Sequence, residues 1–165
     1  MSHSDIQFRA PRAEDGAKIW GLVKETGVLD VNSPYSYMML GEFFSDTCAV
    51  AEVDGEVAGF VSGFIPPEKE DTLFVWQIAV DNKQQGKGIA TSLIEEVVNR
   101  PDHHNLQYVE ATISPSNQPS TRLFHRLSRQ WNTEIQTESC FPADYFPEGQ
   151  QHEEENMYRV GPISK

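Results

Sequence analysis

The chain has 165 residues, of which 38% are hydrophobic and 23% charged, so a single globular domain over residues 1–165 can bury a real core. Its formal net charge of −12 argues against a nucleic acid partner, because phosphates are normally bound by clusters of Lys and Arg that this sequence lacks. The acidity favours a cationic or zwitterionic partner, or it only keeps a solvated surface soluble.

Two further classes are disfavoured by what the sequence does not contain. The N-terminus has no apolar h-region, and no segment offers about eighteen uninterrupted apolar residues, so we expect neither a signal peptide nor a membrane span. Cys48, in an apolar run, and Cys140, in a loop, lack Cys-x-x-Cys or His-cluster spacing. The sequence therefore predicts a cytoplasmic protein with Cys48 in its core and no metal site.

The first half of the chain is predicted to form a strand, two helices and a β-hairpin. Gly27 ends the first helix, and Asp54-Gly55 is a strong signal for a tight turn between two strands. The expected elements are a strand over Ile6–Arg9, a helix over Ala13–Glu25, a loop over Val28–Tyr35, a helix over Ser36–Phe44, and strands over Thr47–Val53 and Glu56–Phe64.

The second half is predicted to alternate strands with helices and to end in two strands. The elements are a strand over Leu73–Val80, a helix from Thr91 to Asn99, a strand over Tyr108–Ile113, a helix over Gln118–Arg129, and strands near Thr133–Thr137 and Asn156–Val160. Together with the first half, this order predicts an α/β or α+β fold, a sheet with helices on both faces.

The most informative feature is the turn after Val80, with the sequence Gln84-Gln85-Gly86-Lys87-Gly88-Ile89-Ala90. Its glycines let consecutive backbone N–H groups converge on an anion, and the N-terminus of the next helix adds partial positive charge. The phosphate loop of nucleotide hydrolases is excluded because the glycines have the wrong spacing. A dinucleotide loop is excluded because its third glycine would fall on Thr91.

The run Gln85-Gly86-Lys87-Gly88-Ile89-Ala90 resembles the Arg/Gln-x-x-Gly-x-Gly/Ala signature of the GNAT family of N-acetyltransferases. The resemblance implies that these residues hold the pyrophosphate of acetyl-coenzyme A (acetyl-CoA). It also implies a single mixed, mostly antiparallel sheet of seven strands, with a splay between strands 4 and 5 that admits the pantetheine arm. Backbone groups of Ile78, Ala79 and Val80 in strand 4 are then expected to face the cofactor, and one of these N–H groups to donate to the thioester oxygen.

A second stretch, Ser116 to Phe124, resembles the Asn-x-x-Ala-x-x-Leu-Tyr stretch of the same family. The resemblance implies that Asn117 bridges towards the pantetheine. The departure is Phe124, because many family members have a tyrosine there that protonates the leaving thiolate, and phenylalanine has no proton to donate. Either another residue supplies this proton, or coenzyme A leaves as the thiolate and is protonated by water.

Three separated segments resemble one branch of the family, which acetylates the side-chain (N4) amine of L-2,4-diaminobutyrate for ectoine biosynthesis. They are Leu29–Tyr37, Phe74–Val80 and Phe141–Tyr158. The resemblance implies a small diamino acid as the acceptor, and it implies a homodimer. Ectoine is a compatible solute, so an acidic surface suited to a salty cytoplasm fits this setting.

Five residues are the candidates for the acceptor site in this resemblance. A diamino acid needs acceptor groups for its two ammonium groups and a donor for its carboxylate. We expect Asp30 and Glu155 around the amines, Tyr35 beside the sulfur, Trp76 as an apolar wall, and His152 as a carboxylate donor or proton relay. Asp30, Tyr35 and Glu155 are the candidates for catalysis.

Each of these residues also has an ordinary structural interpretation. Asp30 could cap the second helix or hold the loop, and Trp76 in an apolar strand could be part of the core. His152 and Glu155 lie in an acidic run, which is usually a solvated face. Two other functions also remain open. One is a GNAT enzyme for another amine, such as a polyamine, ornithine, an aminoglycoside or a protein N-terminus, and the other is a non-catalytic acetyl-CoA sensor.

Overall fold

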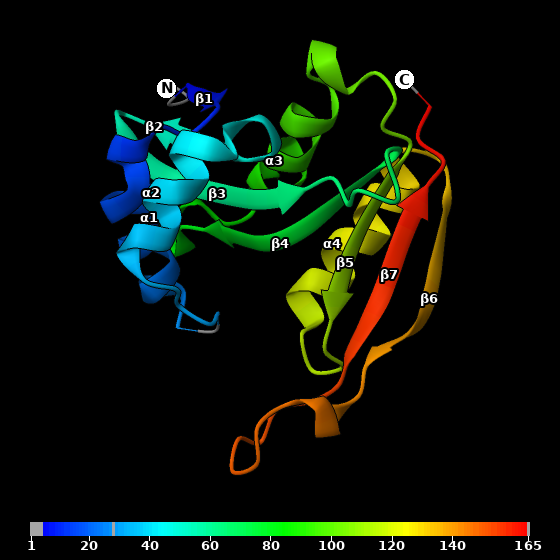
Figure 1. Ribbon diagram of the computed structural model, residues 1–165. Helices are drawn as coiled ribbons and strands as arrows, with labels where there is room; N and C mark the ends of the chain where they lie inside the picture. The colour runs from blue at the N-terminus through cyan, green and yellow to red at the C-terminus, as the bar shows by residue number, and fades with distance from the viewer. Residues whose placement is uncertain (1–4, 28, 165) are drawn as a thin grey trace. The chain divides into compact units, whose positions relative to one another are not determined.

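The computed structural model describes residues 5–27 and 29–164, so Val28, the first residue of the expected loop, lies outside the described residues. The helices are α1 (Gly16–Thr26), α2 (Pro34–Phe43), α3 (Ile89–Val98) and α4 (Gln118–Gln130). The strands are β1 (Ile6–Arg9), β2 (Ala49–Val53), β3 (Glu56–Phe64), β4 (Thr72–Val80), β5 (Tyr108–Ile113), β6 (Glu134–Phe141) and β7 (Glu155–Gly161). The expected order of seven strands and four helices is confirmed, with shifts at the element ends (Figure 1).

The strands form a mixed, mostly antiparallel sheet in the order β1-β2-β3-β4-β5-β7-β6, in which β4 and β5 are parallel. The chain divides into two compact units. One holds residues 1–64 and 75–104, and the other holds residues 65–74 and 105–165. Strand β4 contributes to both. The expected splay between β4 and β5 and the expected single domain concern how the units are arranged, and they stay predictions.

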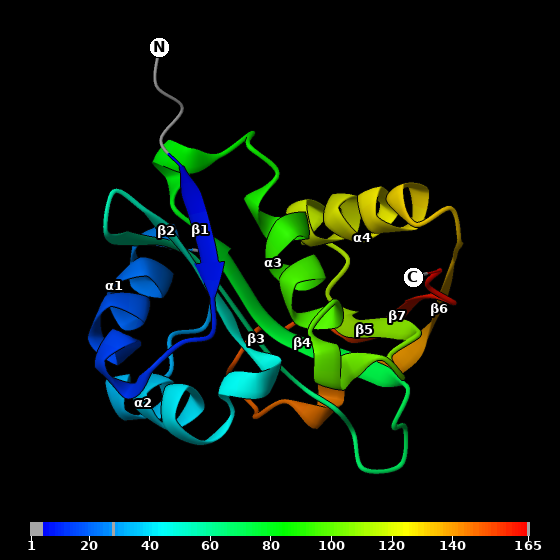
Figure 2. The same ribbon diagram turned by 90° about the horizontal axis from the view of Figure 1, so that it is seen from above.

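In the first unit, α1 and α2 cover one face of the strands and α3 covers the other, as Figure 2 shows. Strand β3 shows how the two faces are used. Phe60 meets Tyr37 of α2 edge to face, with ring centroids 5.8 Å apart. Its neighbour Gly59 lies against α3, where a Cβ atom would come within 2.9 Å of Ile89 Cγ2. Gly59 therefore allows the close approach of helix and strand.

The ends of α1 and α2 follow from local sequence signals. Gly27 takes the left-handed conformation (φ 70°) that ends α1, as expected. Helix α2 starts two residues earlier than predicted because Pro34 fits its first position and Ser33 caps it, with Ser33 Oγ accepting from the Ser36 N–H at 3.3 Å. The suggestion that Asp30 caps this helix is therefore wrong.

The predicted hairpin and the predicted core cysteine are both confirmed. Asp54 and Gly55 have φ values of 53° and 80°, the positive values that a tight turn between β2 and β3 requires. Cys48 is fully buried just before β2, and burial raises the pKa of its thiol to about 11. The thiol is therefore neutral at pH 7 and belongs to the core.

In the second unit, α4 packs on β6 and β7, and Phe124 of α4 meets Tyr158 of β7 edge to face at 6.4 Å. Strand β6 runs four residues beyond its predicted end because it pairs with β7 as far as Phe141 and Glu155. Cys140 therefore lies in this strand, and the expectation that it lies in a loop is wrong. A buried carboxylate links two neighbouring strands, β5 and β7. Glu110 of β5 accepts from Arg159 Nη1 at 2.7 Å and from Lys69 Nζ at 3.2 Å. Two cations thus compensate the burial of one charge.

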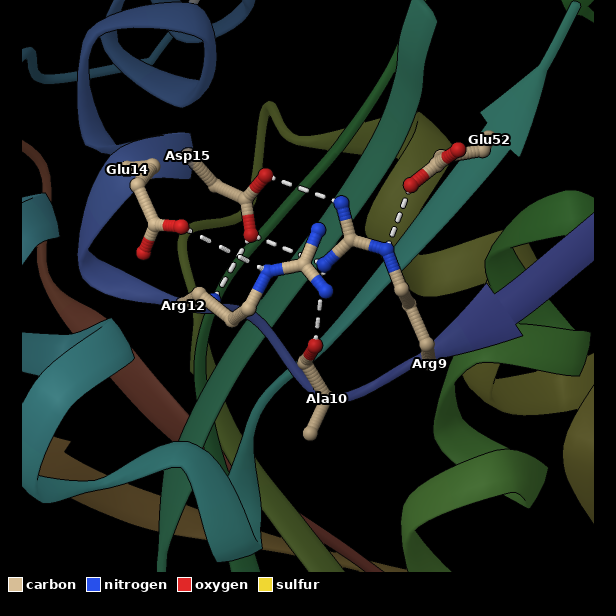
Figure 3. Close-up of polar contacts among 6 residues, drawn as sticks. All are labelled: Arg9, Ala10, Arg12, Glu14, Asp15 and Glu52. Carbon is tan, nitrogen blue, oxygen red and sulfur yellow. Dashed lines mark hydrogen bonds and ion pairs between the residues drawn. The ribbon is translucent and has the colours of Figure 1, made fainter. Parts of the chain in front are cut away.

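A second charged cluster joins three segments of the first unit (Figure 3). The Arg9 guanidinium donates two 2.8 Å hydrogen bonds to the Asp15 carboxylate, and its Nε donates to Glu52 of β2. Asp15 also accepts from the Arg12 N–H at 2.7 Å. Its side chain is only 8% exposed, so the bidentate pair is shielded from solvent. The cluster fixes the turn before α1 against β1 and β2.

Within residues 5–27 and 29–164, no helix is both long and apolar enough to cross a membrane. Over the same residues, no three His, Cys, Asp or Glu side chains are grouped so that they could hold a metal ion.

We predict that Asp15→Asn destabilises the protein by about 2 kcal/mol at pH 7, the typical worth of hydrogen bonds to a charged group. The Arg9 hydrogen bonds hold the pKa of Asp15 below its ordinary value. The carboxylate therefore stabilises the fold above its unfolded pKa of about 3.9, and this contribution is lost as the pH falls through the lower folded pKa. Urea unfolding at pH 7 and at pH 3 should show that the cost of the substitution shrinks in acid.

The matched control is Glu14→Gln, which removes the neighbouring carboxylate, 80% exposed and 4.0 Å from Arg12. It should cost less than about 0.5 kcal/mol at either pH. An Asp15→Asn cost that is the same at both pH values would contradict the assignment.

Candidate active site

The turn between β4 and α3 has the backbone conformation of an anion-binding loop. After Val80 the chain makes a short 3-10 turn over Asn82–Gln84. It then passes through Gly86 and Gly88, whose φ values are 83° and 73°. Side chains rarely tolerate such values, so glycine is required at both positions for a conformational reason. Helix α3 begins at the next residue, Ile89.

The N-terminus of α3 has free donors and free space for an anion. No side chain from the described residues caps this helix at Gly88, so its first backbone N–H groups remain available. A Cβ atom at Gly86 would meet nothing within 4 Å, and one at Gly88 only Thr91 Oγ1 at 3.8 Å. The uncapped donors, the helix dipole and the open space fit a pyrophosphate group.

Two side-chain hydrogen bonds stabilise the turn. Gln85 Nε2 donates to the carbonyl oxygen of Val80 at 3.3 Å, which ties the turn to the end of β4. Lys87 Nζ donates to Gln84 Oε1 at 2.6 Å, so its positive charge stays on the turn. The predicted order of strand, glycine turn and helix is thus confirmed. The contact of Gln85–Ala90 with a cofactor stays a prediction.

Three of the five predicted acceptor-site residues lie in the first unit. Asp30 is exposed in the loop between α1 and α2, and Tyr35 in the first turn of α2 is 68% exposed. Trp76 in β4 is 52% exposed, so the alternative that it belongs to the core is wrong. Large exposed aromatic side chains are costly in a soluble protein and often mark a binding surface.

The loop that contains Asp30 is held by a hydrogen bond from a buried side-chain amide. Gln77 Nε2 donates to the backbone carbonyl of Asp30 at 2.6 Å, and Gln77 Oε1 accepts from the Tyr37 hydroxyl at 2.9 Å. Gln77 lies between Trp76 and Ile78 in β4 but points into the core, with 7% of its surface exposed. Gln77 is not among the site residues expected from the sequence, although an amide inside an otherwise apolar strand was the available signal.

The other two predicted residues, His152 and Glu155, lie in the second unit. The ring of Phe146 stacks on the imidazole of His152, with centroids 3.7 Å apart and planes 9° apart. His152 Nδ1 lies 2.6 Å from the carbonyl oxygen of Glu153. Because a carbonyl only accepts, Nδ1 must carry the proton, and in the neutral ring Nε2 is then an acceptor. Glu155 begins β7 and is half-buried.

A carboxylate connects this acidic segment to the N-terminus of α4. Glu153 accepts from the backbone N–H of Ser116 at 3.2 Å and from its hydroxyl. The next residue, Asn117, caps α4 by accepting from the Ser120 N–H at 3.2 Å through Oδ1. This cap uses the amide oxygen of Asn117 and not its amide NH₂. The run over 152–155 is thus not a freely solvated face, because two of its side chains have defined partners.

Phe124 in α4 is only 2% exposed and packs against Tyr158. It stands at the position at which many GNAT enzymes have a tyrosine that acts as the acid. In this protein the side chain at that position belongs to the hydrophobic core. If a side chain donates the proton to the leaving thiolate, it has to come from elsewhere.

The sheet order, the uncapped glycine turn after β4 and the Asn-capped α4 define a GNAT acetyltransferase, and comparison with known proteins agrees. The model of the Acetyltransferase (GNAT) family matches residues 18–128, more than half of the chain. The chain therefore belongs to this family, whose enzymes take the acetyl group from acetyl-CoA.

Within the family, the chain is similar to L-2,4-diaminobutyric acid acetyltransferases. The L-2,4-diaminobutyric acid acetyltransferase of Marinococcus halophilus is 48% identical over 164 residues, which cover 99% of this chain and 94% of the relative. The enzyme of that name from Halalkalibacterium halodurans is 48% identical over 158 residues, 96% of this chain and 82% of the relative.

A solved structure extends the similarity from the sequence to the fold. It is diaminobutyrate acetyltransferase from Paenibacillus lautus, in complex with its substrate L-2,4-diaminobutyric acid and coenzyme A. The TM-score is 0.93 at 39% identity, covering 99% of this chain and 98% of that one.

We predict that Gly88→Ala raises the KM for acetyl-CoA about tenfold. The substitution forces a side chain into the left-handed region, and a turn that relaxes loses at least one charge-assisted N–H contact, worth ~1.5 kcal/mol. Steady-state kinetics with acetyl-CoA as the varied substrate measure the effect.

The matched control is Gly55→Ala in the β2–β3 turn, where φ is 80° and a Cβ atom would also meet nothing within 4 Å. It carries the same backbone strain away from the glycine turn. Its KM for acetyl-CoA should be unchanged, and an equal rise in both variants would show that strain alone is responsible.

Proposed function

We propose that this protein transfers the acetyl group of acetyl-CoA to the N4 amine of L-2,4-diaminobutyrate, giving N4-acetyl-L-2,4-diaminobutyrate for ectoine biosynthesis. The observation that carries the proposal is the near full-length similarity to the Paenibacillus lautus enzyme, whose solved complex holds both this diamino acid and coenzyme A. The glycine turn supports the donor side, because its uncapped helix N-terminus suits a pyrophosphate.

The acceptor amine has to lose a proton before it can attack. A side-chain ammonium with a pKa near that of lysine, about 10.4, is almost fully protonated at neutral pH. Asp30 and Glu155 are the carboxylates that surround the two amines in this proposal, and one of them takes the proton. The nitrogen then attacks the carbonyl carbon of the thioester, and the backbone N–H groups of Ile78–Val80 provide a donor for the carbonyl oxygen.

Regiochemistry has to come from geometry, because the α-amine is generally the less basic and hence the more readily deprotonated of the two. The α-amino-carboxylate end is held, and the terminal nitrogen is directed to the thioester. Trp76 forms an apolar wall in this proposal. His152 acts in this proposal as a donor to the carboxylate or as a proton relay.

The proton for the leaving thiolate is assigned to Tyr35. Phe124 has no proton to give, whereas the phenol of Tyr35 is largely exposed at the start of α2. On the donor side, the proposal places the pyrophosphate on Gln85–Ala90 and the pantetheine near Asn117, whose amide NH₂ is not used by the helix cap.

We also propose a cytoplasmic homodimer. Phe141 and Tyr145 in the second unit are exposed aromatic residues that could bury against a second copy, whereas Phe146 is occupied by its stack on His152. Both cysteines are free thiols, which suits a reducing compartment.

The experiment that tests the function measures thiol release from acetyl-CoA with parallel acceptors: L-2,4-diaminobutyrate, ornithine, lysine, 2,3-diaminopropionate and putrescine. We expect fast release with diaminobutyrate, and NMR should locate the acetyl group on N4. Release with another amine only would keep the GNAT chemistry and discard the substrate. Binding of acetyl-CoA with no release for any amine would favour the sensor alternative.

We predict that Asp30→Ala and Glu155→Ala each lower kcat/KM for diaminobutyrate about 100-fold, the usual loss when a group that moves a proton or holds a charged substrate is removed. The KM for acetyl-CoA should change little. The control is Glu25→Ala on the exposed side of α1, which changes the net charge equally. Near wild-type turnover in either site variant would show that its assigned role is wrong.

A further inference from the structure

Gln77 is a polar residue at a core position of β4. Side chains of this strand alternate in exposure, and Gln77 shares its face with Val75 and Ala79, which are 4% and 3% exposed. An apolar side chain would satisfy packing at this position. A buried amide is tolerated only if its donor and acceptor are paired, so its partners indicate why it is there.

The partners of Gln77 are the loop between α1 and α2 and the first turns of α2. Its Nε2 donates to the Asp30 carbonyl at 2.6 Å, and its Oε1 accepts from the Tyr37 hydroxyl at 2.9 Å. The same hydroxyl accepts from the Asn32 N–H at 3.4 Å. Gln77 and Tyr37 thus hold two backbone groups of the loop, one on each side of Val31.

The holding pair is itself rigid. Tyr37 is fully buried and packs edge to face on Phe60. The backbone N–H of Gln77 also has a buried partner, because it donates to Ser62 Oγ at 3.2 Å. Moving the Asp30 loop away would leave the amide and the phenol partly unpaired in the core, so the pair resists any displacement of the loop.

Asp30 is exposed, and among the described residues no hydrogen bond or ion pair orients its side chain. Its direction therefore depends on its backbone, which Gln77 fixes. We propose that Gln77 is a positioning residue for acetyl transfer: it holds the backbone of Asp30 so that the carboxylate meets the acceptor amine. This inference rests on the proposed function, in which Asp30 contacts that amine, and it adds the residue through which the carboxylate is aligned.

A double-mutant cycle separates positioning from simple stabilisation. Gln77→Met keeps the length of the side chain and removes both hydrogen bonds, while Asp30→Ala keeps the backbone carbonyl that Gln77 holds. We expect Gln77→Met to lower kcat/KM for diaminobutyrate about tenfold in the wild-type background and less than twofold in the Asp30→Ala background. Its effect on urea unfolding should be the same in both backgrounds, because neither of the lost hydrogen bonds involves the Asp30 side chain.

Two variants control for the loss of buried polar contacts. Ser62→Ala removes the hydroxyl that accepts from the Gln77 N–H, in the same core, without touching the loop, and it should leave kcat/KM within twofold of wild type. If Gln77→Met does not fold, Gln77→Glu replaces it, because a carboxylate can still accept from Tyr37 but cannot donate to the Asp30 carbonyl. The KM for acetyl-CoA should stay within twofold in each variant.

The outcomes distinguish this proposal from the function on which it rests. An unchanged kcat/KM in Gln77→Met, or an equal fall in both Asp30 backgrounds, would overturn the positioning role even in an active diaminobutyrate acetyltransferase. If wild type acetylates only another amine, the proposed substrate fails, and the cycle is run with that amine. A fall confined to the background that contains Asp30 would then still support the role of Gln77.

Discussion

The alternation of side chains along β4 is the constraint on which the rest of the structure depends. One face of the strand contributes Val75, Gln77 and Ala79 to the core, and the next residue along from each belongs to the other face, where Trp76 is half exposed. A shift of one residue would exchange Gln77 and Trp76. It would bury the indole, expose the amide and release the loop that carries Asp30. The glycine turn follows directly at the end of the same strand.

Each unit carries a buried carboxylate that is paired with arginine. In the first unit, Asp15 receives a bidentate pair from Arg9, and in the second, Glu110 lies between Arg159 and Lys69. Arg159 also lies over the ring of Tyr108, with Cζ 3.7 Å from its centroid. Burial makes such charges costly alone, so each pair favours one arrangement of the strands that it joins. A chain with a net charge of −12 thus places scarce cations where they compensate buried acids.

The glycine turn and the Asp30 loop present different groups to charged ligands. The turn presents backbone donors and a helix dipole, so it needs no cationic side chain to attract a phosphate. The loop presents a carboxylate whose backbone is fixed by a buried amide. Both are organised by contacts within one unit of the chain. Such organisation lowers the entropy that a ligand would otherwise lose on ordering its site.

The sequence by itself determined the order of the elements and the conformation of the glycine turn proposed to bind acetyl-CoA. Period-2 runs and turn residues such as Asp54-Gly55 act locally, and so do Gly86 and Gly88, whose positive φ is a property of the residue itself. These features can be predicted because their causes lie within a few neighbouring residues. Helix α2 starts two residues before its predicted start, because Ser33 caps the helix inside the segment that was predicted to be a loop.

Only the tertiary structure decided which polar residues act on others. Gln77 and Asp30 are 47 residues apart in sequence, Glu153 and Ser116 are 37 apart, and Arg159 and Glu110 are 49 apart. No periodicity or local propensity encodes these contacts, because they exist only once segments distant in sequence come together in the fold. The same holds for Trp76, which its apolar neighbours suggested was core. Its exposure depends on which segments cover that face of β4, and packing alone determines this.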